Sequence, residues 1–261
     1  MEIDVIKKRR IGRMKIILSI ILLTLLLWGS GYRTNISLYD FFVGIPNIWS
    51  TLLDMYPPDW GYFHYVIGPM LETIRIAIIG TTIGGLLSIP IVLLSSRNVT
   101  RSQFLFYPAR FILNLIRTIP ELLLAALFVP IFGIGPIAGI FAITIFSLGV
   151  IAKLAYEAVE AIDPGPLEAM TAVGANKIQW IFFGVVPQVA ANYMSYFLYS
   201  FEINIRAAVI LGYVGAGGIG LILNNVLASY QYSRALSIIL FTLVVVTMID
   251  AISNKIREKL L

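Results

Sequence analysis

The stretch that decides the fold is Glu168-Ala169-Met170-Thr171-Ala172-Val173-Gly174-Ala175-Asn176-Lys177, the longest moderately polar island in a very apolar chain. Asp163-Pro164-Gly165-Pro166 comes just before it, and prolines at first-turn positions favour a helix start. A short helix is predicted over 167–173, and Gly174, which tolerates the left-handed cap conformation, ends it. Asn176 is predicted to cap a second short helix, because a glutamine follows three residues later as in a capping box. We expect this helix–turn–helix to lie between two membrane spans as a protruding docking element.

The composition around this island is that of an integral membrane protein. Of the 261 residues, 59% are hydrophobic and 13% are charged, whereas soluble domains carry about 25% charged residues. The chain has no cysteine and one histidine, His64, which excludes thiol chemistry and argues against a histidine-based metal or acid–base site. We therefore expect no metal and no cofactor. The net charge of +5 does not indicate nucleic-acid binding, because the basic residues follow the membrane topology.

Six apolar stretches are long enough to cross about 30 Å of hydrocarbon at about 1.5 Å per residue. They are 15–32, 69–95, 107–132, 135–156, 190–212 and 234–254. The second contains Gly80 and Gly84, a small-xxx-small face suited to close helix packing. The first also fits a cleaved signal peptide, because it has a charged start and small residues after it. We favour an uncleaved span, since an even number of spans puts both basic termini on the same side.

The distribution of basic residues orients these spans. With six spans and both termini in the cytoplasm, 14 of the 19 Lys and Arg residues are cytoplasmic, as the positive-inside rule requires. This arrangement makes 1–14 and 255–261 cytoplasmic ends and places the loop 157–189 in the cytoplasm. The segment 33–68 is then extracytoplasmic. It is rich in aromatic residues, which concentrate at membrane interfaces, so short helices lying on the outer leaflet or a landing surface for a partner are expected there.

The loop resembles the cytoplasmic coupling signature of the membrane subunits of bacterial ABC importers, Glu-Ala-(Ala)-x3-Gly-x9-(Ile)-x-(Leu)-Pro. Glu168, Ala169, Gly174 and Pro187 match it at the right spacing, whereas Met170, Gly184 and Val186 depart from it. The resemblance implies an all-α integral membrane protein with six transmembrane helices, the type I ABC importer permease fold, and a coupling helix. It also implies contact with an ATPase through Leu167, Glu168, Ala169, Met170, Gly174, Asn176, Lys177 and Pro187. The alternative is an ordinary cytoplasmic linker.

Four further segments are similar to the phosphonate importer permeases. They are Pro57-Pro58-Asp59-Trp60, Leu71-Glu72-Thr73-Ile74, Arg117-Thr118-Ile119-Pro120-Glu121-Leu122-Leu123 and the stretch 201–220. This resemblance covers most of the chain and makes 69–254 the importer transmembrane domain. It implies a homodimer in the bacterial cell membrane, cytoplasmic ATPase subunits that carry the ATP hydrolysis, and an extracytoplasmic phosphonate-binding protein. Another phosphorus oxyanion remains an alternative substrate, as does methionine, because methionine importer permeases share the Pro120 and glycine-rich segments.

Ionisable residues within the spans are candidates for a substrate pathway. Arg117 and Glu121 flank Pro120, and Glu202 and Arg206 lie in the fifth span. Each pair has i, i+4 spacing, so it is expected to share a helix face and to neutralise itself. Each pair is therefore interpreted either as packing or as the polar wall of a path that offers arginines to an anion.

The glycine run after the fifth span also suits a tight or re-entrant turn whose amides could touch a passing anion. Its members are Gly215, Gly217, Gly218 and Gly220.

The sequence argues against two other classes of protein. An intramembrane aspartyl protease needs two membrane aspartates, and only Asp250 qualifies, while a serine type would need a buried histidine. A passive channel fits the spans but has no use for the coupling loop.

Overall fold

The computed structural model describes residues 2–34 and 38–260. The chain divides into two units, Met1–Asp54 and Met55–Leu261. The first unit contains α1 (Glu2–Arg33) and most of α2 (Leu38–Met55). The part of α1 from Met14 to Arg33 is apolar enough to cross a membrane. A helix that is apolar all round is stable where hydrocarbon or packed side chains surround it.

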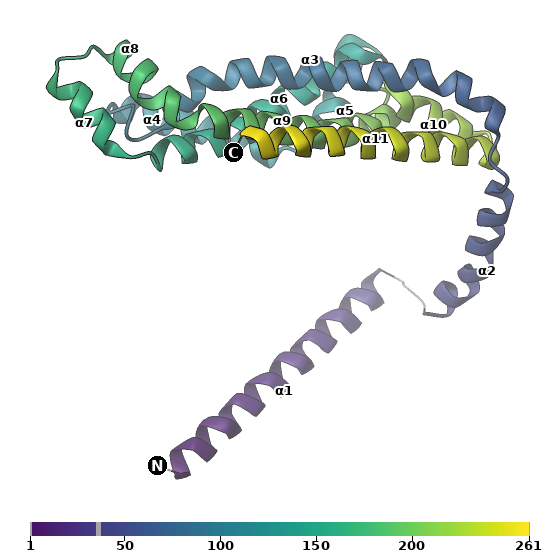
Figure 1. Ribbon diagram of the computed structural model, residues 1–261. Coiled ribbons are helices and arrows are strands. Elements are labelled where there is room, and N and C mark those ends of the chain that lie inside the picture. The colour runs from purple at the N-terminus through teal and green to yellow at the C-terminus, as the bar shows by residue number, and fades with distance from the viewer. Residues whose placement is uncertain (1, 35–37, 261) are drawn as a thin grey trace. The chain divides into compact units, whose positions relative to one another are not determined.

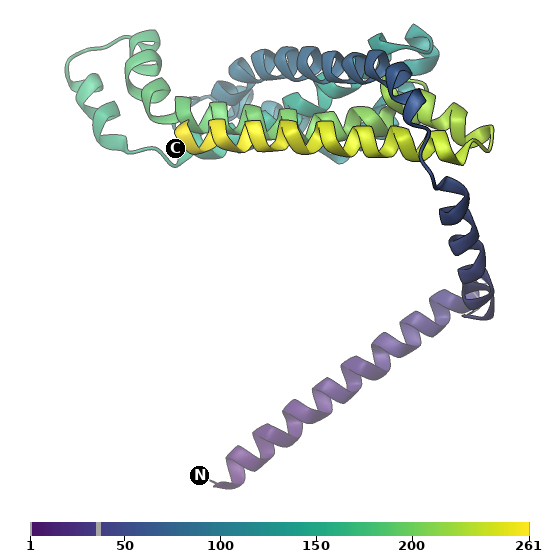
Figure 2. The ribbon, with the colours of Figure 1, turned by 45° about the vertical axis from the view of Figure 1, so that its right-hand side comes forward.

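The second unit is a bundle of long helices. Its main members are α3 (Phe63–Ser95), α6 (Pro136–Glu160), α9 (Val186–Leu211) and α11 (Tyr232–Leu260). Figures 1 and 2 show these four running alongside one another. At one end of the bundle, here called the loop end, lie the short helices α7 (Pro164–Ala172) and α8 (Lys177–Gln179), and α10 (Gly218–Ala228) lies at the other.

The small residues predicted to form a packing face do so. A Cβ atom on Gly84 would lie 2.6 Å from the carbonyl oxygen of Thr144, and one on Gly80 would lie 2.7 Å from the Ile143 side chain. Because both glycines lack that atom, the backbones of α3 and α6 approach closely. This contact forms the centre of the bundle.

The third predicted span is not one continuous helix. The chain forms α4 (Gln103–Thr118) and α5 (Glu121–Phe132), which meet at 88°. Proline lacks a backbone N–H and disfavours the helical conformation at the preceding residue. At this position the helix does break, because Ile119, just before Pro120, is extended at φ −90° and ψ 116°. The described part of the chain therefore has five helices able to span a membrane, or six if this bent pair forms one span.

The other predicted elements differ mainly at their boundaries. The loop helix expected over 167–173 begins at Pro164, where Asp163 accepts a hydrogen bond from the Gly165 amide at 2.9 Å. The span expected over 190–212 begins earlier, because a π-helical turn, η2 (Trp180–Val185), joins α8 directly to α9. After α9, the turn η3 (Gly212–Val214) leads to α10, so the glycine run makes a tight turn followed by a short apolar helix.

Candidate coupling loop and membrane pathway

The turn between the two loop helices has the conformation predicted for it. Gly174 has φ +77°, a value that costs glycine little and other residues more. Its amide donates to the Thr171 oxygen at 3.1 Å, and the Ala175 amide donates to the Met170 oxygen at 3.0 Å. These two bonds form a Schellman cap, which satisfies carbonyls at the end of α7.

The second loop helix begins with the predicted capping box. The Gln179 amide donates to Asn176 Oδ1 at 2.9 Å, and the Asn176 amide donates to Gln179 Oε1 at 3.0 Å. Two amides that would otherwise lack partners are thereby satisfied. The second helix follows immediately after the Gly174 turn, so its start is fixed by local sequence alone.

A few buried contacts attach α7 to the bundle. Leu167 is buried, and its carbonyl accepts a hydrogen bond from Trp180 Nε1 at 3.2 Å. A Cβ atom on Gly184 would lie 2.6 Å from Leu167 Cδ2. The leucine side chain therefore occupies the space that the isoleucine of the coupling signature would need at this position. Gln188, one residue after Pro187, accepts from the Asp163 amide at 3.0 Å and so ties the start of α7 to α9.

The opposite surface of the loop is exposed. Glu168 and Ala169 are exposed on α7, and Val173 and Ile178 are 82% and 70% exposed beside the Gly174 turn. Apolar side chains that project together from a protruding element are typical of a surface that a partner covers. The structure thus brings the predicted coupling residues together at the loop end, with Pro187 set back at the start of α9.

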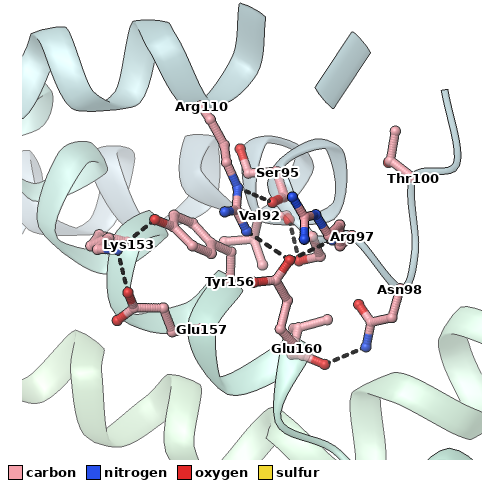
Figure 3. A network of polar contacts seen from close by, with 12 residues as sticks. Val92, Ser95, Arg97, Asn98, Thr100, Arg110, Lys153, Tyr156, Glu157 and Glu160 are labelled. Atoms are coloured by element: carbon pink, nitrogen blue, oxygen red, sulfur yellow. Dashed lines mark hydrogen bonds and ion pairs between the residues drawn. The ribbon is translucent and has the colours of Figure 1, made fainter. Parts of the chain in front are cut away.

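A polar network that the sequence did not reveal fixes the loop end of the bundle (Figure 3). Its centre is Glu160, the last residue of α6. Glu160 Oε1 lies 2.6 Å from Arg110 Nη2 of α4 and accepts from the Arg97 amide at 2.7 Å. Asn98 Nδ2 donates to the Val159 oxygen at 2.6 Å, and Lys177 of α8 donates to the Val99 oxygen at 2.8 Å. The loop 96–102 therefore connects α8 with both α6 and α4.

Arg110 is further held by two aromatic rings. Its guanidinium carbon lies 4.5 Å from the centre of the Phe106 ring and 4.4 Å from that of Tyr156, distances at which cation–π attraction operates. Its Nε also donates to the Ser95 oxygen at 2.9 Å. These contacts come from α3, α4 and α6, so Arg110 joins the three helices at the loop end.

The predicted pairing of Arg117 with Glu121 is wrong. Arg117 lies in the last turn of α4, whereas Glu121 begins α5 beyond the 88° bend. An i, i+4 pair requires an uninterrupted helix, and Pro120 interrupts this one. Arg117 is exposed, and among the described residues its side chain has no hydrogen-bonding or ion-pair partner. It packs beside Gly149, midway along α6, where an added Cβ would lie 3.0 Å from Arg117 Cγ.

The predicted pairing of Glu202 with Arg206 is confirmed, and two further residues extend it. Arg206 Nη2 lies 2.9 Å from Glu202 Oε1, and Arg206 Nη1 lies 2.6 Å from Asp250 Oδ2. Arg257 Nη2, on a residue expected in the cytoplasmic tail, lies 3.0 Å from Glu202 Oε2. Two cations and two carboxylates thus alternate in one chain of ion pairs, which joins α9 to α11 and is balanced in charge. The Arg206 side chain remains 46% exposed.

The depth of this charged chain follows from its neighbour Asn204. The Asn204 amide nitrogen donates to Thr81 Oγ1 at 2.7 Å and to Ser147 Oγ at 2.6 Å, midway along α3 and α6. Glu202 and Arg206 therefore lie near the middle of the bundle's length, and the charged chain extends from there to Arg257 in the last turn of α11. At such a depth an exposed charge faces a water-filled cavity or another chain, because exposure to hydrocarbon is costly.

Most of the chain matches one known protein family. Residues 80–260 match the family described as the inner membrane component of binding-protein-dependent transport systems. The chain belongs to this family. It is the permease subunit of an ABC importer and therefore a transport subunit.

Three permeases are similar to this one in sequence. The phosphite transport system permease protein PtxC of Stutzerimonas stutzeri is 33% identical over 96% of this chain and 89% of its own length. The putative cryptic phosphonate transport system permease protein PhnE2 of Escherichia coli K12 is 44% identical over 45% of this chain and 96% of its own. The phosphate-import permease protein PhnE of Mycolicibacterium smegmatis is 41% identical over 72% of this chain and 36% of its own.

Solved structures agree on the fold. An inward-facing form of the MetNI methionine ABC transporter superposes with a TM-score of 0.70 at 19% identity, covering 78% of the permease and 99% of that chain. A bacterial alginate importer gives 0.58 at 17% identity, covering 91% and 95%. The permease thus has the expected all-α, type I ABC importer fold. At these identities the likeness says nothing about the substrate.

The glycine run of the permease is bonded within the chain. The Gly218 amide donates to Glu72 Oε1 at 3.1 Å, and the Ile219 amide donates to Thr73 Oγ1 at 2.8 Å. Two early amides of α10 are therefore not free to bind a passing anion. The Gly215 amide is also used, by the Gly212 oxygen at 3.0 Å. A Cβ atom on Gly217 would lie 2.7 Å from Glu72 Oε1, so the glycines allow α3 to reach the start of α10.

The permease should be destabilised when Glu160 is replaced by glutamine. The side chains of Glu160 and Arg110 are each only 27% exposed, so the lost charge-assisted bonds should cost about 1–3 kcal/mol. The apparent melting temperature of the purified protein in detergent measures this loss. Glu157→Gln is the matched control, because Glu157 is 53% exposed and pairs with Lys153 along one helix, an interaction worth about 0.3–0.5 kcal/mol. Equal melting temperatures for the two variants would contradict a special role for Glu160.

Proposed function

We propose that this permease imports phosphonate or a related phosphorus oxyanion, received from an extracytoplasmic binding protein and driven by a cytoplasmic ATPase that docks on the 168–174 loop. The observation that carries the coupling role is the protruding pair α7 and α8. These helices hold the signature residues at the loop end, with Glu168, Ala169 and Val173 exposed. An exposed helix–turn–helix joined to α4 and α6 through the Glu160 network can pass a partner's movement into the bundle.

The substrate class is inferred from relatives and from charge. The relatives described above are named for phosphite, phosphonate and phosphate. Oxyanions of phosphorus share tetrahedral oxygens that guanidinium groups bind in a bidentate manner. An importer of such anions needs cationic groups along its path, and this chain has exposed arginines at span depth.

We assign the path to the α4–α5 break and the neighbouring face of α9. Broken helices at the middle of a membrane commonly form transporter binding sites, because the free backbone groups at the break face a cavity. Arg117 stands at this break, together with Pro120 and Glu121, and it lacks a partner among the described residues. Arg206 is the second cation assigned to the path. Its guanidinium already holds Glu202 and Asp250, so we expect its contribution to be the smaller.

Uptake by arginine variants tests this path. Arg117→Gln should lower binding-protein-dependent uptake of labelled methylphosphonate by at least about tenfold, since it removes a charge-assisted contact. Arg117→Lys should retain part of it. Arg206→Lys and the double variant Glu202→Gln/Arg206→Gln should each lose less. Full uptake by Arg117→Gln would contradict the assignment of Arg117, and full uptake by the double variant would leave Arg206 a structural residue that joins α9 to α11.

The same reconstituted complex tests the proposed function as a whole. Proteoliposomes that contain the permease, its ATPase and the binding protein should accumulate methylphosphonate or phosphite. They should do so only when ATP is supplied on the side of the membrane where the ATPase lies. Methionine should not compete. Accumulation without ATP would indicate a passive channel, and accumulation of methionine would indicate a different solute.

We also propose that two copies of the permease form a homodimer in the bacterial cell membrane, each docking one ATPase. A dimer explains why charged and apolar side chains of α9 and α11 remain exposed in the single chain, with Arg206 at 46% and Leu243 at 62%. A second copy or a shared water-filled cavity would cover this face.

The proposed orientation makes a labelling prediction. Ser50→Cys and Asn225→Cys should react with an impermeant thiol reagent added to intact cells, because both positions are exposed and expected outside. Asn176→Cys, at the loop end, should react only after the cells are permeabilised. The natural chain has no cysteine, so each variant carries a single reactive site and the unmodified protein is the blank. Labelling of Asn176→Cys in intact cells would invert the proposed topology.

A further inference from the structure

A cavity lies at the loop end of the bundle, outside the path described above. Its volume is about 290 Å³, and α3, α6, η2 and the start of α9 enclose it. Its walls include Val92, Ala155, Val185 and Ala190. This volume is about ten times the ~30 Å³ that one water molecule occupies in the liquid. It has room for a segment of a hydrocarbon chain but not for a whole lipid.

The cavity offers no polar group to a ligand. All the residues that line it are apolar except Tyr193. The Tyr193 hydroxyl is already bonded inside the protein, where it donates to the Gly85 oxygen at 2.6 Å and lies 3.1 Å from Ser88 Oγ. A phosphorus oxyanion would therefore lose its hydration there without replacement, so the cavity is not part of the substrate path. Its chemistry fits an aliphatic ligand.

The cavity lies at the ends of two candidate membrane spans. Val92 lies three residues before the end of α3, and Val159 lies one residue before the end of α6, and both helices are candidate spans. The rim is formed by exposed apolar side chains, with Ile89 45%, Phe182 63% and Val186 40% exposed. These side chains meet lipid tails or another chain, because they lie at the end of the apolar part of the bundle.

The loop end also carries positive charge. Lys177 is exposed one helical turn before Ile181, which lines the cavity, and Arg101 is exposed in the loop 96–102. An apolar slot with cations close to its mouth matches a lipid whose tail enters the slot while its anionic headgroup stays at the interface.

We propose that the cavity binds an acyl chain of an anionic phospholipid from the leaflet at the loop end, which is the cytoplasmic leaflet in the proposed topology. The acyl chain fills the gap between the end of α6 and the π-helical turn η2. It therefore supports the segment that joins the coupling loop to α9. π-Helical turns are frequent at functional sites, and this one forms one wall of the cavity. This lipid site requires only that the protein lies in a membrane. It does not depend on which substrate the permease transports.

A photoactivatable lipid tests the proposal directly. The probe is phosphatidylglycerol with a diazirine near the middle of one acyl chain, added to the full chain in nanodiscs of phosphatidylcholine. After irradiation, mass spectrometry should find labelled peptides concentrated in 89–93, 155–159 and 181–190. The same probe with a choline headgroup should label these peptides about fivefold less, since one nearby lysine favours an anionic lipid by about 1 kcal/mol. Lys177→Gln should reduce this difference.

Two neighbouring alanines provide a matched pair of variants. Ala190 lines the cavity, whereas Ala191 is exposed but does not line it. Ala190→Phe should fill the slot and lower labelling of its walls by about tenfold or more, because close-packed side chains leave no room for a tail. Ala191→Phe should leave the labelling unchanged.

Labelling spread evenly over the exposed apolar helices, or equal loss in both variants, would overturn the proposal. So would a disulfide between two copies carrying Ala190→Cys, because it would show that a second chain fills the slot. Since labelling is measured without ATP, binding protein or substrate, none of these outcomes depends on the proposed transport activity.

Discussion

A complex assembled with Gly174→Pro should hydrolyse ATP at its basal rate whether or not the loaded binding protein is present. Gly174 has φ +77° and donates its amide to the Thr171 oxygen at 3.1 Å. Proline fixes φ near −65° and has no N–H to donate. The substitution therefore removes the cap between α7 and α8 and changes the direction in which the exposed docking surface points. The measurement is ATPase activity of the reconstituted complex with and without ligand-loaded binding protein.

The bundle itself should remain intact in this variant. A Cβ atom on Gly174 would meet nothing within 4 Å, so the effect is one of backbone conformation and not of packing. Gly174→Asn is the matched control, because asparagine adopts the left-handed conformation more readily than other non-glycine residues, and it should retain most of the stimulation. If a correctly assembled Gly174→Pro complex were stimulated normally, the loop would not be the coupling element.

The largest effect on stability is expected from Gly220→Ala. A Cβ atom there would lie 1.9 Å from the Val209 oxygen and 2.9 Å from Gly212 Cα. Both contacts are with backbone, so no side-chain rotation relieves them, and α10 must move away from the end of α9. We expect a loss of more than about 4 kcal/mol, which falls in the range of severe packing defects. Recovery of monodisperse protein after membrane extraction and its apparent melting temperature measure this loss.

Gly68→Ala is the matched control for this experiment. Gly68 lies within α3, and an added Cβ would have no neighbour within 4 Å. Alanine has a higher helix propensity than glycine by about 0.5–1 kcal/mol, but its Cβ is disfavoured in a helix directly before a proline, and Pro69 follows. The two effects oppose each other, so we expect a net change within about 1 kcal/mol. The two glycine-to-alanine changes are thus predicted to differ by more than about 3 kcal/mol in their effect on stability. A normal yield and melting temperature for Gly220→Ala would show that α10 does not pack against α9 as closely as the structure indicates.

Local sequence determined the elements whose physics acts over a few residues. Gly174 ends a helix because its missing side chain permits a positive φ, and Asn176 begins the next one because its side chain reaches the amide of Gln179. The small residues of α3 indicated a close helix contact in the same way. The apolar stretches showed the class of the protein, because about 30 Å of hydrocarbon requires about 20 apolar residues.

The i, i+4 spacing predicted two charged pairs, and only one of them forms. Glu202 and Arg206 pair because α9 continues through them, whereas Arg117 and Glu121 do not, because the helix breaks at Pro120. The spacing of four residues was identical in both cases. Whether a proline in a span kinks the helix or divides it depends on the neighbours that satisfy the freed backbone groups, and spacing does not contain that information.

The tertiary structure alone decided which distant residues meet. Arg206 reaches Asp250, 44 residues away, and Glu72 caps α10 at Gly218, 146 residues away. Glu160 joins α6 to α4 and to the loop after α3, although none of its neighbours follows a sequence motif. Such contacts are set by the rotation and crossing of packed helices, which depend on shape complementarity along their whole length. The sequence therefore determined most of the spans and the turn at Gly174, whereas packing determined that Arg206 is paired and Arg117 is not.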